Sequence, residues 1–274
     1  MKGIVDRLTG GIFRKRNSRL ALVLSGGGAR GWAHIGLLKA LEEEGVRVEA
    51  ISGVSAGSII GALSANGNTA GEILEIVQET DMFKIIRKGV FPLMTGAFSS
   101  LGHLEHQLMR FLPENSFEAL EKSFFVTAVN LNAGKAEVFS SGELHKPVMA
   151  SCAVPLLFAP VRIGDDLYAD GGVLNNLPVE PLLGKRYRII GSNVVLPSPK
   201  RKMDGFRSIS MRSFELVSYK GMEENARKCD AMITYEGLER FNLFRFSAAQ
   251  DIVDLGYRCA KEQLPICLKQ LDIS

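Results

Sequence analysis

The sequence of 274 residues predicts a single α/β domain built around a mostly parallel sheet. Short apolar runs typical of buried strands alternate with helix-like stretches from about residue 20 onward. Two glycine-rich turns each follow such a strand and precede a helix, as expected where helices connect parallel strands. The composition, with 46% hydrophobic and 23% charged residues, is that of an ordinary globular protein.

The first two strand–turn–helix units have the clearest patterns. Residues 20–24 (LALVL) are predicted as a buried strand, and residues 32–44 as a helix closed by Gly45. A second strand at 46–52 leads through the turn 53–57 into another helix. Later strands are predicted at 124–130, 137–140, 161–163, 167–169, 188–194 and 231–235.

The two ends of the chain differ in character from this alternating part. Residues 1–19 hold six basic residues against the single acid Asp6, so we expect a basic tail that contacts anionic membrane lipid peripherally, with a solvated tail as the alternative. Residues 20–274 form the single domain, and their part 200–274 is predicted to be mainly helical and to cover the sheet. The basic residues of the tail are Lys2, Arg7, Arg14, Lys15, Arg16 and Arg19.

The sequence also bears on location and metals. It has no apolar run of roughly 18 to 20 residues that would span a bilayer, and its start lacks a secretory signal, so we expect a cytoplasmic protein. The four cysteines show no C-x-x-C spacing, which argues against a zinc or redox site. Residues 88–99, rich in Gly, Pro and aromatic residues, are either a mobile cover over a site or a packed connection.

The pentapeptide GVSAG at residues 53–57 matches the G-x-S-x-G nucleophile elbow and stands, as that motif requires, between a strand and a helix. The serine of such an elbow has a strained backbone, and Gly53, Ala56 and Gly57 are small enough for the neighbouring turns to approach it. Ser55 would then project its hydroxyl at a helix N-terminus, where the helix dipole favours developing negative charge. The alternative is a tight turn in which Ser55 only caps the helix.

The loop SGGGARG at residues 25–31 presents several backbone N–H groups at the start of a helix, which is a site for an anion. In an esterase that anion is the oxyanion of the tetrahedral intermediate. The same loop, however, spells G-x-G-x-x-G at Gly26, Gly28 and Gly31, with Glu49 about 20 residues further on, as in dinucleotide-binding folds. The second glycine-rich turn favours the esterase, because a dinucleotide fold does not need it.

A third motif, ADGGVLNNLPVEP, begins at residue 169. Asp170 follows a predicted hairpin strand, and Gly171 with Gly172 lets the backbone turn tightly and bring the carboxylate toward another segment. The alternative is an ordinary Asp-Gly turn with local hydrogen bonds.

The positions of the histidines decide between catalytic mechanisms. An α/β-hydrolase triad has the chain order Ser, Asp or Glu, His, but every histidine here precedes Asp170. A triad of Ser55 and Asp81 with a later histidine is formally possible, although those histidines lie in stretches without a motif. A dyad in which a carboxylate takes the serine proton directly fits better. The histidines are His34, His103, His106 and His145.

These motifs, in this order, resemble the patatin-like phospholipase family, specifically its short bacterial members. The similarity spans about residues 20–200 and includes G-G-G-x-R-G at 26–31, A-H-I-G at 33–36, G-x-S-x-G at 53–57, A-S-C-A-V-P-L-L-F-A-P at 150–160 and D-G-G at 170–172. The resemblance implies a three-layer α/β/α fold and a Ser55–Asp170 dyad. It also implies an oxyanion hole from the backbone of Gly27, Gly28, Ala29 and Arg30.

The resemblance further implies a serine acyl-ester hydrolase that acts on lipid esters, of phospholipase A or lysophospholipase type, through an acyl-enzyme. A lipid or acyl ester is then the expected partner, no nucleic acid is expected, and no metal or organic cofactor is required. Ser25 departs from the family, many of whose members have Asp there, which removes an ion pair with Arg30 but not the backbone donors. A dinucleotide-binding protein and a non-catalytic lipid-binding regulator are the alternatives, and the oligomeric state stays open.

Overall fold

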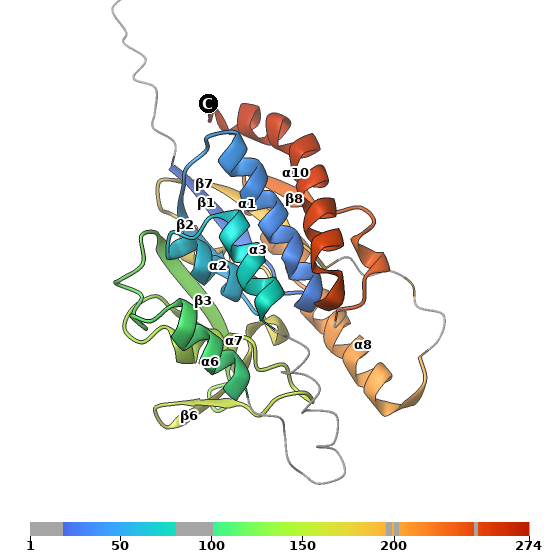
Figure 1. Cartoon of the computed structure of the whole chain (residues 1–274). Coiled ribbons are helices and arrows are strands. Elements are labelled where there is room, and N and C mark those ends of the chain that lie inside the picture. Colours follow the sequence, from blue (N-terminus) through green and yellow to red (C-terminus); the bar gives the residue numbers. More distant parts are fainter. Residues whose placement is uncertain (1–18, 81–100, 196–198, 200–202, 244–245, 274) are drawn as a thin grey trace, which may run out of the picture.

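The computed structural model describes residues 19–80, 101–195, 199, 203–243 and 246–273. Within these ranges eight strands form one sheet in the order β5-β6-β3-β2-β1-β7-β8, and β4 pairs with β3 (Figure 1). The strands are β1 (Arg19–Leu24), β2 (Val48–Gly53), β3 (Ser123–Asn130), β4 (Lys135–Phe139), β5 (Val161–Ile163), β6 (Asp166–Asp170), β7 (Tyr187–Asn193) and β8 (Ala231–Thr234).

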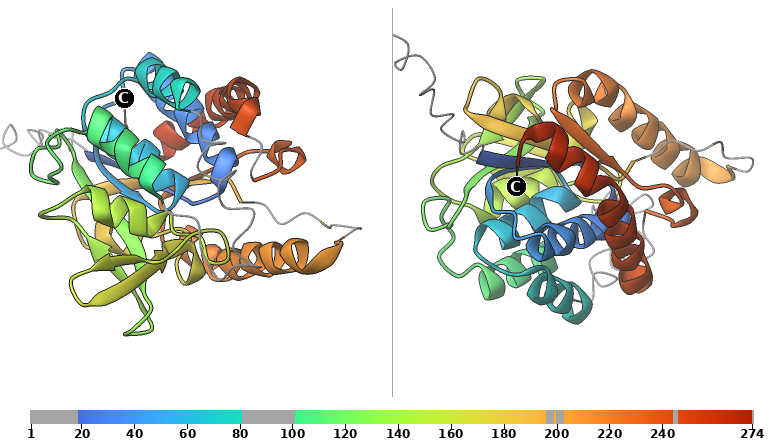
Figure 2. Two further views of the ribbon diagram at one scale, coloured as in Figure 1. Left: turned by 60° about the horizontal axis from the view of Figure 1, so that its bottom comes forward. Right: turned by 90° about the horizontal axis from the view of Figure 1, so that it is seen from above.

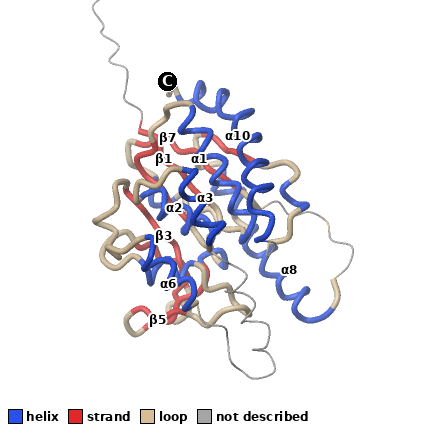
Figure 3. Tube along the Cα trace, in the orientation of Figure 1, coloured by secondary structure: helices blue, strands red, loops and turns tan. Residues whose placement is uncertain are grey.

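Helices surround this sheet (Figure 3). They are α1 (Ala33–Glu43), α2 (Ala56–Ala65), α3 (Ala70–Glu79), α6 (Gly102–Phe111), α7 (His145–Ser151), α8 (Gly205–Tyr219), α9 (Met222–Ala226) and α10 (Ala249–Leu271), with short 3-10 turns η1 (Gly28–Trp32), η2 (Gly171–Val173), η3 (Glu180–Leu182), η4 (Leu238–Arg240) and η5 (Phe246–Ala248). The helices α1, α3 and α10 lie on one side of the sheet and α8 on the other (Figure 2).

The sheet is parallel at its centre and antiparallel at one end. Strands β3, β2, β1, β7 and β8 pair in parallel, whereas β4 and β6 run antiparallel to β3, and β5 antiparallel to β6. The predicted α/β class with a mostly parallel central sheet is therefore confirmed.

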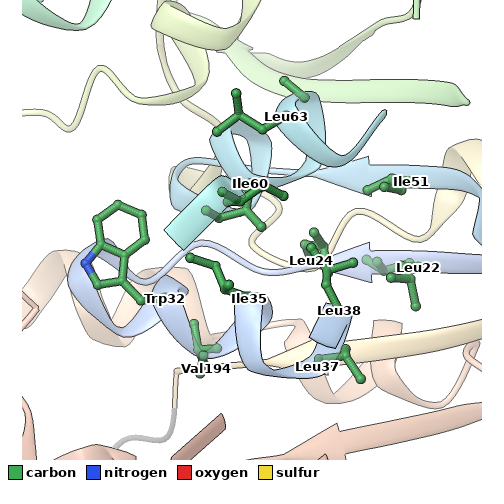
Figure 4. Close-up of a cluster of buried hydrophobic side chains, with 14 of the residues drawn as sticks. Leu22, Leu24, Trp32, Ile35, Leu37, Leu38, Ile51, Ile60, Leu63 and Val194 are labelled. Carbon is green, nitrogen blue, oxygen red and sulfur yellow. The ribbon is translucent and has the colours of Figure 1, made fainter. Parts of the chain in front are cut away.

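The core lies between the central strands and the helices that cover them. Residues 20–24 of β1 are all buried, as expected for a central strand with both faces covered. A cluster of apolar side chains joins β1 and β2 to α1 and α2, and Figure 4 shows its members Leu22, Leu24, Trp32, Ile35, Leu37, Leu38, Ile51, Ile60, Leu63 and Val194. This core fixes the positions of the two glycine-rich turns, which leave the ends of β1 and β2.

Helix α10 packs closely against α1 because glycine is present on both sides. A Cβ atom at Gly36 would collide with the backbone of Val253 and Tyr257, and one at Gly256 would collide with the backbone of Ala33. The glycine of the A-H-I-G segment therefore serves contact between helices, and the C-terminal helix is tied to the first helix of the fold.

The ends of the chain differ in part from the sequence prediction. Arg19, which the charge pattern groups with the tail, begins β1 and pairs with Glu49 at 3.1 Å. The strand predicted at 231–235 is present as β8 and pairs with β7, so the C-terminal part adds a strand to the sheet. The tail before residue 19 and the segment 88–99 lie outside the described residues. In the described ranges, no helix has the length and apolar character that crossing a bilayer requires.

Candidate active site

Strand β3 brings the elbow and the D-G-G motif together. Gly53, the last residue of β2, pairs with Val126, and Asp170, the last residue of β6, pairs with Ala128. Val126 and Ala128 also pair with β4, so β4 occupies one edge of β3. Strands β2 and β6 therefore lie one after the other along the opposite edge of β3. β2 runs parallel and β6 antiparallel to β3, so their last residues meet end to end, two β3 residues or about 7 Å apart.

The backbone of Ser55 is strained, as the elbow interpretation requires. Its φ of 52° and ψ of −125° lie in a region that non-glycine residues rarely adopt. The Ser55 N–H donates to Ser151 Oγ at 2.9 Å, and that hydroxyl donates to the Thr127 carbonyl at 2.7 Å. The Ser55 carbonyl accepts from Ser58 Oγ at 2.7 Å and from Cys152 Sγ at 3.4 Å. These contacts hold a conformation that would otherwise relax.

Two of those contacts explain the A-S-C-A-V-P segment, to which the sequence assigned no role. Ser151 and Cys152 hold the backbone of Ser55, and the carbonyl of the next residue, Ala153, accepts the N–H of Asp170 at 3.0 Å. The segment therefore fixes both the elbow and the base of the D-G-G turn.

The Asp170 carboxylate is buried, with only 1% of the residue exposed. Its Oδ1 accepts from the Gly172 N–H at 2.7 Å, whereas Oδ2 makes no hydrogen bond of ordinary geometry within the described part of the chain. Burial raises the pKa of Asp170 to about 7, although the nearby Ser55 hydroxyl and the Gly172 N–H act in the opposite direction. Such a carboxyl changes protonation near neutral pH, as a general base must.

The four predicted oxyanion donors divide into two pairs. The Ala29 N–H donates to the Leu243 carbonyl at 2.7 Å, and the Arg30 N–H donates to the Gly27 carbonyl at 3.2 Å, so both are engaged. The N–H groups of Gly27 and Gly28 have no acceptor among the described residues, and both glycines line the same cavity as Ser55. Gly28 needs to be glycine, because its φ is +55° and the Leu243 carbonyl leaves no room for a Cβ.

A cavity of about 50 Å³ is lined by both Ser55 and Asp170. Residues of the C-terminal part, for which the sequence predicted only a covering role, form much of its wall. In the sequence, the only pattern that accompanies these wall residues is the apolar periodicity of a helix. The cavity is lined by Gly27, Gly28, Ser55, Val154, Asp170, Asn176, Val195, Met211, Phe214, Glu215, Ser218 and Leu243.

Arg30 is buried rather than exposed, contrary to the usual position of an arginine in a surface loop. Its guanidinium donates to the Phe241 carbonyl at 2.8 Å and to the Glu239 carbonyl at 3.2 Å, and it pairs with Glu215 at 3.5 Å. Burial lowers the pKa of Arg30, and the nearby Glu215 carboxylate opposes this. The Arg30 side chain therefore connects the glycine-rich loop to the C-terminal part of the chain. Its carboxylate partner is Glu215, because residue 25 is a serine and carries no acid.

His34 belongs to a buried chain of hydrogen bonds. Its Nε2 lies 2.9 Å from the Ser25 carbonyl and must donate to it, so Nδ1 accepts from the Ser192 hydroxyl at 2.8 Å. The Tyr235 hydroxyl lies 2.6 Å from Ser192 Oγ and completes the chain as a donor. Burial lowers the pKa of His34 to about 4, so it stays neutral and supports the start of the glycine-rich loop.

The structure gives no support to a histidine triad with Ser55. None of the four histidines lines the cavity in the described part of the chain. His145 Nε2 lies 2.7 Å from the Leu112 carbonyl, in a buried structural contact. Asp81, the alternative acid, lies outside the described residues.

The dinucleotide interpretation fails on the position of its acid. A ribose-binding carboxylate stands near the carboxyl end of the second strand, beside the glycine-rich loop. Glu49 lies near the start of β2, at the opposite end of the sheet from that loop, and pairs with Arg19. In the described ranges no cluster of His, Cys, Asp and Glu has the arrangement of a metal site.

Comparison with known proteins identifies the family of this chain. The family model described as patatin-like phospholipase matches residues 22–183, which include the glycine-rich loop, Ser55 and Asp170. An NTE family protein of Mycobacterium tuberculosis is 29% identical over 247 residues, covering 86% of this chain and 60% of its own length. Lysophospholipase NTE1 of Cryptococcus neoformans is 32% identical over 170 residues, covering 60% of this chain and 10% of its own length. The chain thus spans no more than 60% of these relatives.

Two solved structures share the fold at low sequence identity. VipD from Legionella pneumophila superimposes with a TM-score of 0.50 at 16% identity, over 91% of this chain and 67% of VipD. The ExoU–SpcU complex from Pseudomonas aeruginosa superimposes with a TM-score of 0.50 at 17% identity, over 92% of this chain and 53% of the matched chain. The family match extends over more than half of the sequence and includes all three motifs, so the chain belongs to the patatin-like phospholipase family.

Proposed function

We propose that the protein is a serine hydrolase of lipid acyl esters, of phospholipase A or lysophospholipase type, in which Ser55 is the nucleophile and Asp170 the base. The observation that carries the proposal is the meeting, in one cavity, of a serine with strained backbone and a buried carboxylate whose pKa is raised to about 7. Family membership supports lipid esters as the substrate class. The similarity to a lysophospholipase supports the same class.

The chemistry is a two-step acyl transfer. Ser55 Oγ attacks the ester carbonyl while its proton passes to the Asp170 carboxylate, and the N–H groups of Gly27 and Gly28 stabilise the oxyanion. When the C–O bond of the leaving alcohol breaks, that alcohol takes the proton from Asp170. Water then attacks the acyl-Ser55 ester, gives a proton to Asp170, and releases the fatty acid as Ser55 recovers its hydrogen. The residues used are all supplied by the chain.

The raised pKa of Asp170 has a consequence for this mechanism. The base works only when it is ionised, so kcat/KM is expected to rise with pH through about 7. A carboxylate at that pKa is also a stronger base than an exposed one, which favours proton transfer from a serine hydroxyl.

Covalent labelling with a fluorophosphonate tests the proposal. We expect a single adduct on Ser55 that is lost in Ser55→Ala and formed much more slowly in Asp170→Asn, with both variants retaining the circular dichroism of the wild type. Labelling of Ser151→Ala is expected to be slowed as well, since Ser151 holds the Ser55 backbone. A folded wild-type protein that neither labels nor hydrolyses acyl esters of graded chain length would leave the lipid-binding regulator as the better hypothesis.

A further inference from the structure

Asn176 lines the candidate catalytic cavity, and the proposed mechanism gives it no role. It lies in the loop between η2 and η3, with only 6% of the residue exposed. The sequence singles out its segment, ADGGVLNNLPVEP, for the D-G-G motif alone. A buried carboxamide normally has hydrogen-bond partners for both its oxygen and its nitrogen, so the partners of Asn176 bear on what the cavity holds.

The oxygen of this carboxamide accepts no hydrogen bond from the described residues. The Asn176 Nδ2 lies 3.6 Å from the Met222 Sδ, which is a weak acceptor, and this is the contact that orients the side chain. The Oδ1 atom is left with its lone pairs available to a molecule in the cavity.

Two glycines locate this oxygen among the three motifs. A Cβ atom at Gly26 would come within 2.4 Å of the Asn176 Oδ1 and 3.0 Å of the Ser55 Cβ. A Cβ atom at Gly172 would come within 2.9 Å of the same oxygen and 3.0 Å of the Asp170 Oδ1. Neither glycine has a positive φ, so glycine is needed there for space and not for backbone conformation. The space of a single methyl group thus separates the oxygen from the nucleophile's side chain, and again from the carboxylate.

The second step of the proposed reaction requires a hydrogen-bond acceptor in this place. The attacking water has two hydrogens, and one passes to Asp170, whose Oδ2 makes no ordinary hydrogen bond within the described part of the chain. The other stays on the water and needs an acceptor, because a donor left unpaired in a closed cavity is unfavourable. A cavity of about 50 Å³ has room for only a few water molecules, so the wall must supply that acceptor.

Asn176 meets this requirement better than the other polar side chains of the wall. The Glu215 carboxylate is already paired with two arginines. The Ser218 hydroxyl carries a hydrogen of its own, whereas the carboxamide oxygen can only accept. The carboxamide is also neutral, and a second carboxylate so close to Asp170 would repel its ionised form.

We propose that the Asn176 Oδ1 holds the water that hydrolyses the acyl-enzyme, by accepting the O–H that does not react. The inference rests on the proposed function. The water oxygen bonds to the acyl carbonyl carbon while one of its protons passes to the Asp170 carboxylate and its other hydrogen stays bonded to Asn176. When the C–O bond to Ser55 breaks, the Ser55 Oγ takes the proton back from Asp170 and the carboxylic acid leaves.

Competition between water and methanol tests this role. Methanol has a single O–H, which passes to Asp170, so it has no second hydrogen for Asn176 to hold. With dissolved p-nitrophenyl butyrate in dilute methanol, we expect Asn176→Ala to raise the ratio of methyl butyrate to butyric acid about tenfold, since water alone loses a hydrogen bond. Gas chromatography measures both products, and their ratio depends neither on the amount of folded enzyme nor on the rate of acylation.

The neighbouring asparagine is the matched control. Asn175 accepts from the Leu177 N–H at 3.3 Å and from the Asn225 Nδ2 at 3.0 Å, and donates to Glu180 at 2.8 Å, but it does not line the cavity. Asn175→Ala is expected to leave the product ratio at the wild-type value. Asn176→Leu fills the space of the carboxamide without an acceptor and is expected to raise the ratio as the alanine variant does, so the test stands even if the alanine variant fails to fold.

The steady-state constants give a second measurement. Because water enters only after the acyl-enzyme has formed, kcat and KM for p-nitrophenyl butyrate are expected to fall together in the Asn176 variants, with kcat/KM changed less than about twofold. A tenfold fall of kcat/KM with an unchanged product ratio would show that Asn176 acts on acylation, and would overturn the inference.

The remaining outcomes separate this inference from the proposed function. An unchanged product ratio in both Asn176 variants, with the wild type still labelled on Ser55, would overturn the role of Asn176 and leave the hydrolase standing. A ratio that responds to Ser218→Ala and not to Asn176→Ala would assign the water to α8, with the same result for the inference. A folded wild type that forms neither product and does not label would overturn the proposed function, and the role of Asn176 with it.

Discussion

The region matched by the family model, residues 22–183, and the region from residue 203 onward contribute to the same site in different ways. The first holds the proposed nucleophile Ser55, the proposed base Asp170 and the N–H groups of Gly27 and Gly28, and it carries every recognisable motif. The second has no motif, yet it provides Met211, Phe214 and Leu243 to the cavity wall, and the acceptors that hold Arg30. Residues that react must meet strict geometric demands, whereas a wall can be built from many apolar side chains.

The glycines illustrate those demands. A Cβ at Gly57 would collide with the backbone at Leu24 and Ser25, so the elbow and the glycine-rich loop approach each other only if this residue is glycine. No comparable restriction applies to Phe214 or Met211 on α8, where another apolar residue would also fill the space. A sequence pattern therefore marks the chemistry of the site more clearly than its shape.

The sharpest test of the motif-bearing region is the substitution of Asp170, its proposed base. Asp170→Asn keeps the shape of the side chain but cannot accept the Ser55 proton, so kcat/KM for an acyl ester is expected to fall about 10⁴-fold or more. Steady-state kinetics with a soluble ester measures this. Asp166→Asn, four residues earlier on β6, is the control and is expected to change the rate less than about twofold. Comparable rates for Asp170→Asn and the wild type would remove Asp170 from the mechanism.

The sequence predicted the α/β class, the central strands and the two glycine-rich turns, because these depend on local apolar patterns and on glycine at tight turns. It did not predict the roles of Ser151 and Cys152, since their contacts with Ser55 join segments about 95 residues apart. The contribution of Phe214 to the cavity was missed for the same reason. The resemblance named four oxyanion donors. In the structure the N–H groups of Ala29 and Arg30 already have acceptors, so among the described residues only those of Gly27 and Gly28 remain free out of the four.

The contact between the two regions is tested through Arg30. Arg30→Met removes the donor to two backbone carbonyls and one partner of the buried Glu215, so the free energy of unfolding is expected to fall by about 3 kcal/mol. Urea unfolding at neutral pH measures the change. Arg110→Met is the matched control, because its ion pair with Glu79 is exposed and should contribute less than about 0.5 kcal/mol. Equal effects of the two substitutions would mean that Arg30 does not hold the regions together.

The burial of Asp170 predicts that its ionised form, which the proposed mechanism requires, destabilises the folded protein. Its folded-state pKa of about 7 lies above the ordinary value, so the folded protein binds this proton more tightly than the unfolded chain. The contribution of Asp170 to stability is therefore lost as pH rises from about 4 to 7. Asp170→Asn is expected to be more stable than the wild type by about 2–4 kcal/mol near pH 8, with a smaller difference near pH 4.

Urea unfolding of both proteins across this pH range checks the sign. The depressed pKa of His34 makes both proteins less stable as pH falls from about 6.5 to 4, but this contribution cancels in their difference. A difference that shrinks as pH rises would show that the carboxyl is not buried in the way the structure describes.

The smallest expected effect concerns the wall, where the two faces of α8 offer a paired experiment. Phe214 lines the cavity and Phe206 belongs to the exposed face of the same helix. Phe214→Ala enlarges the cavity, so the ratio of kcat/KM for a longer acyl ester over a shorter one is expected to rise about tenfold, which is the usual scale for a change of pocket size. Phe206→Ala is expected to leave that ratio unchanged on dissolved esters. If both substitutions changed the ratio equally, or neither did, acyl selectivity would have to reside in the motif-bearing region. The assignment of substrate selection to the C-terminal wall would then be wrong.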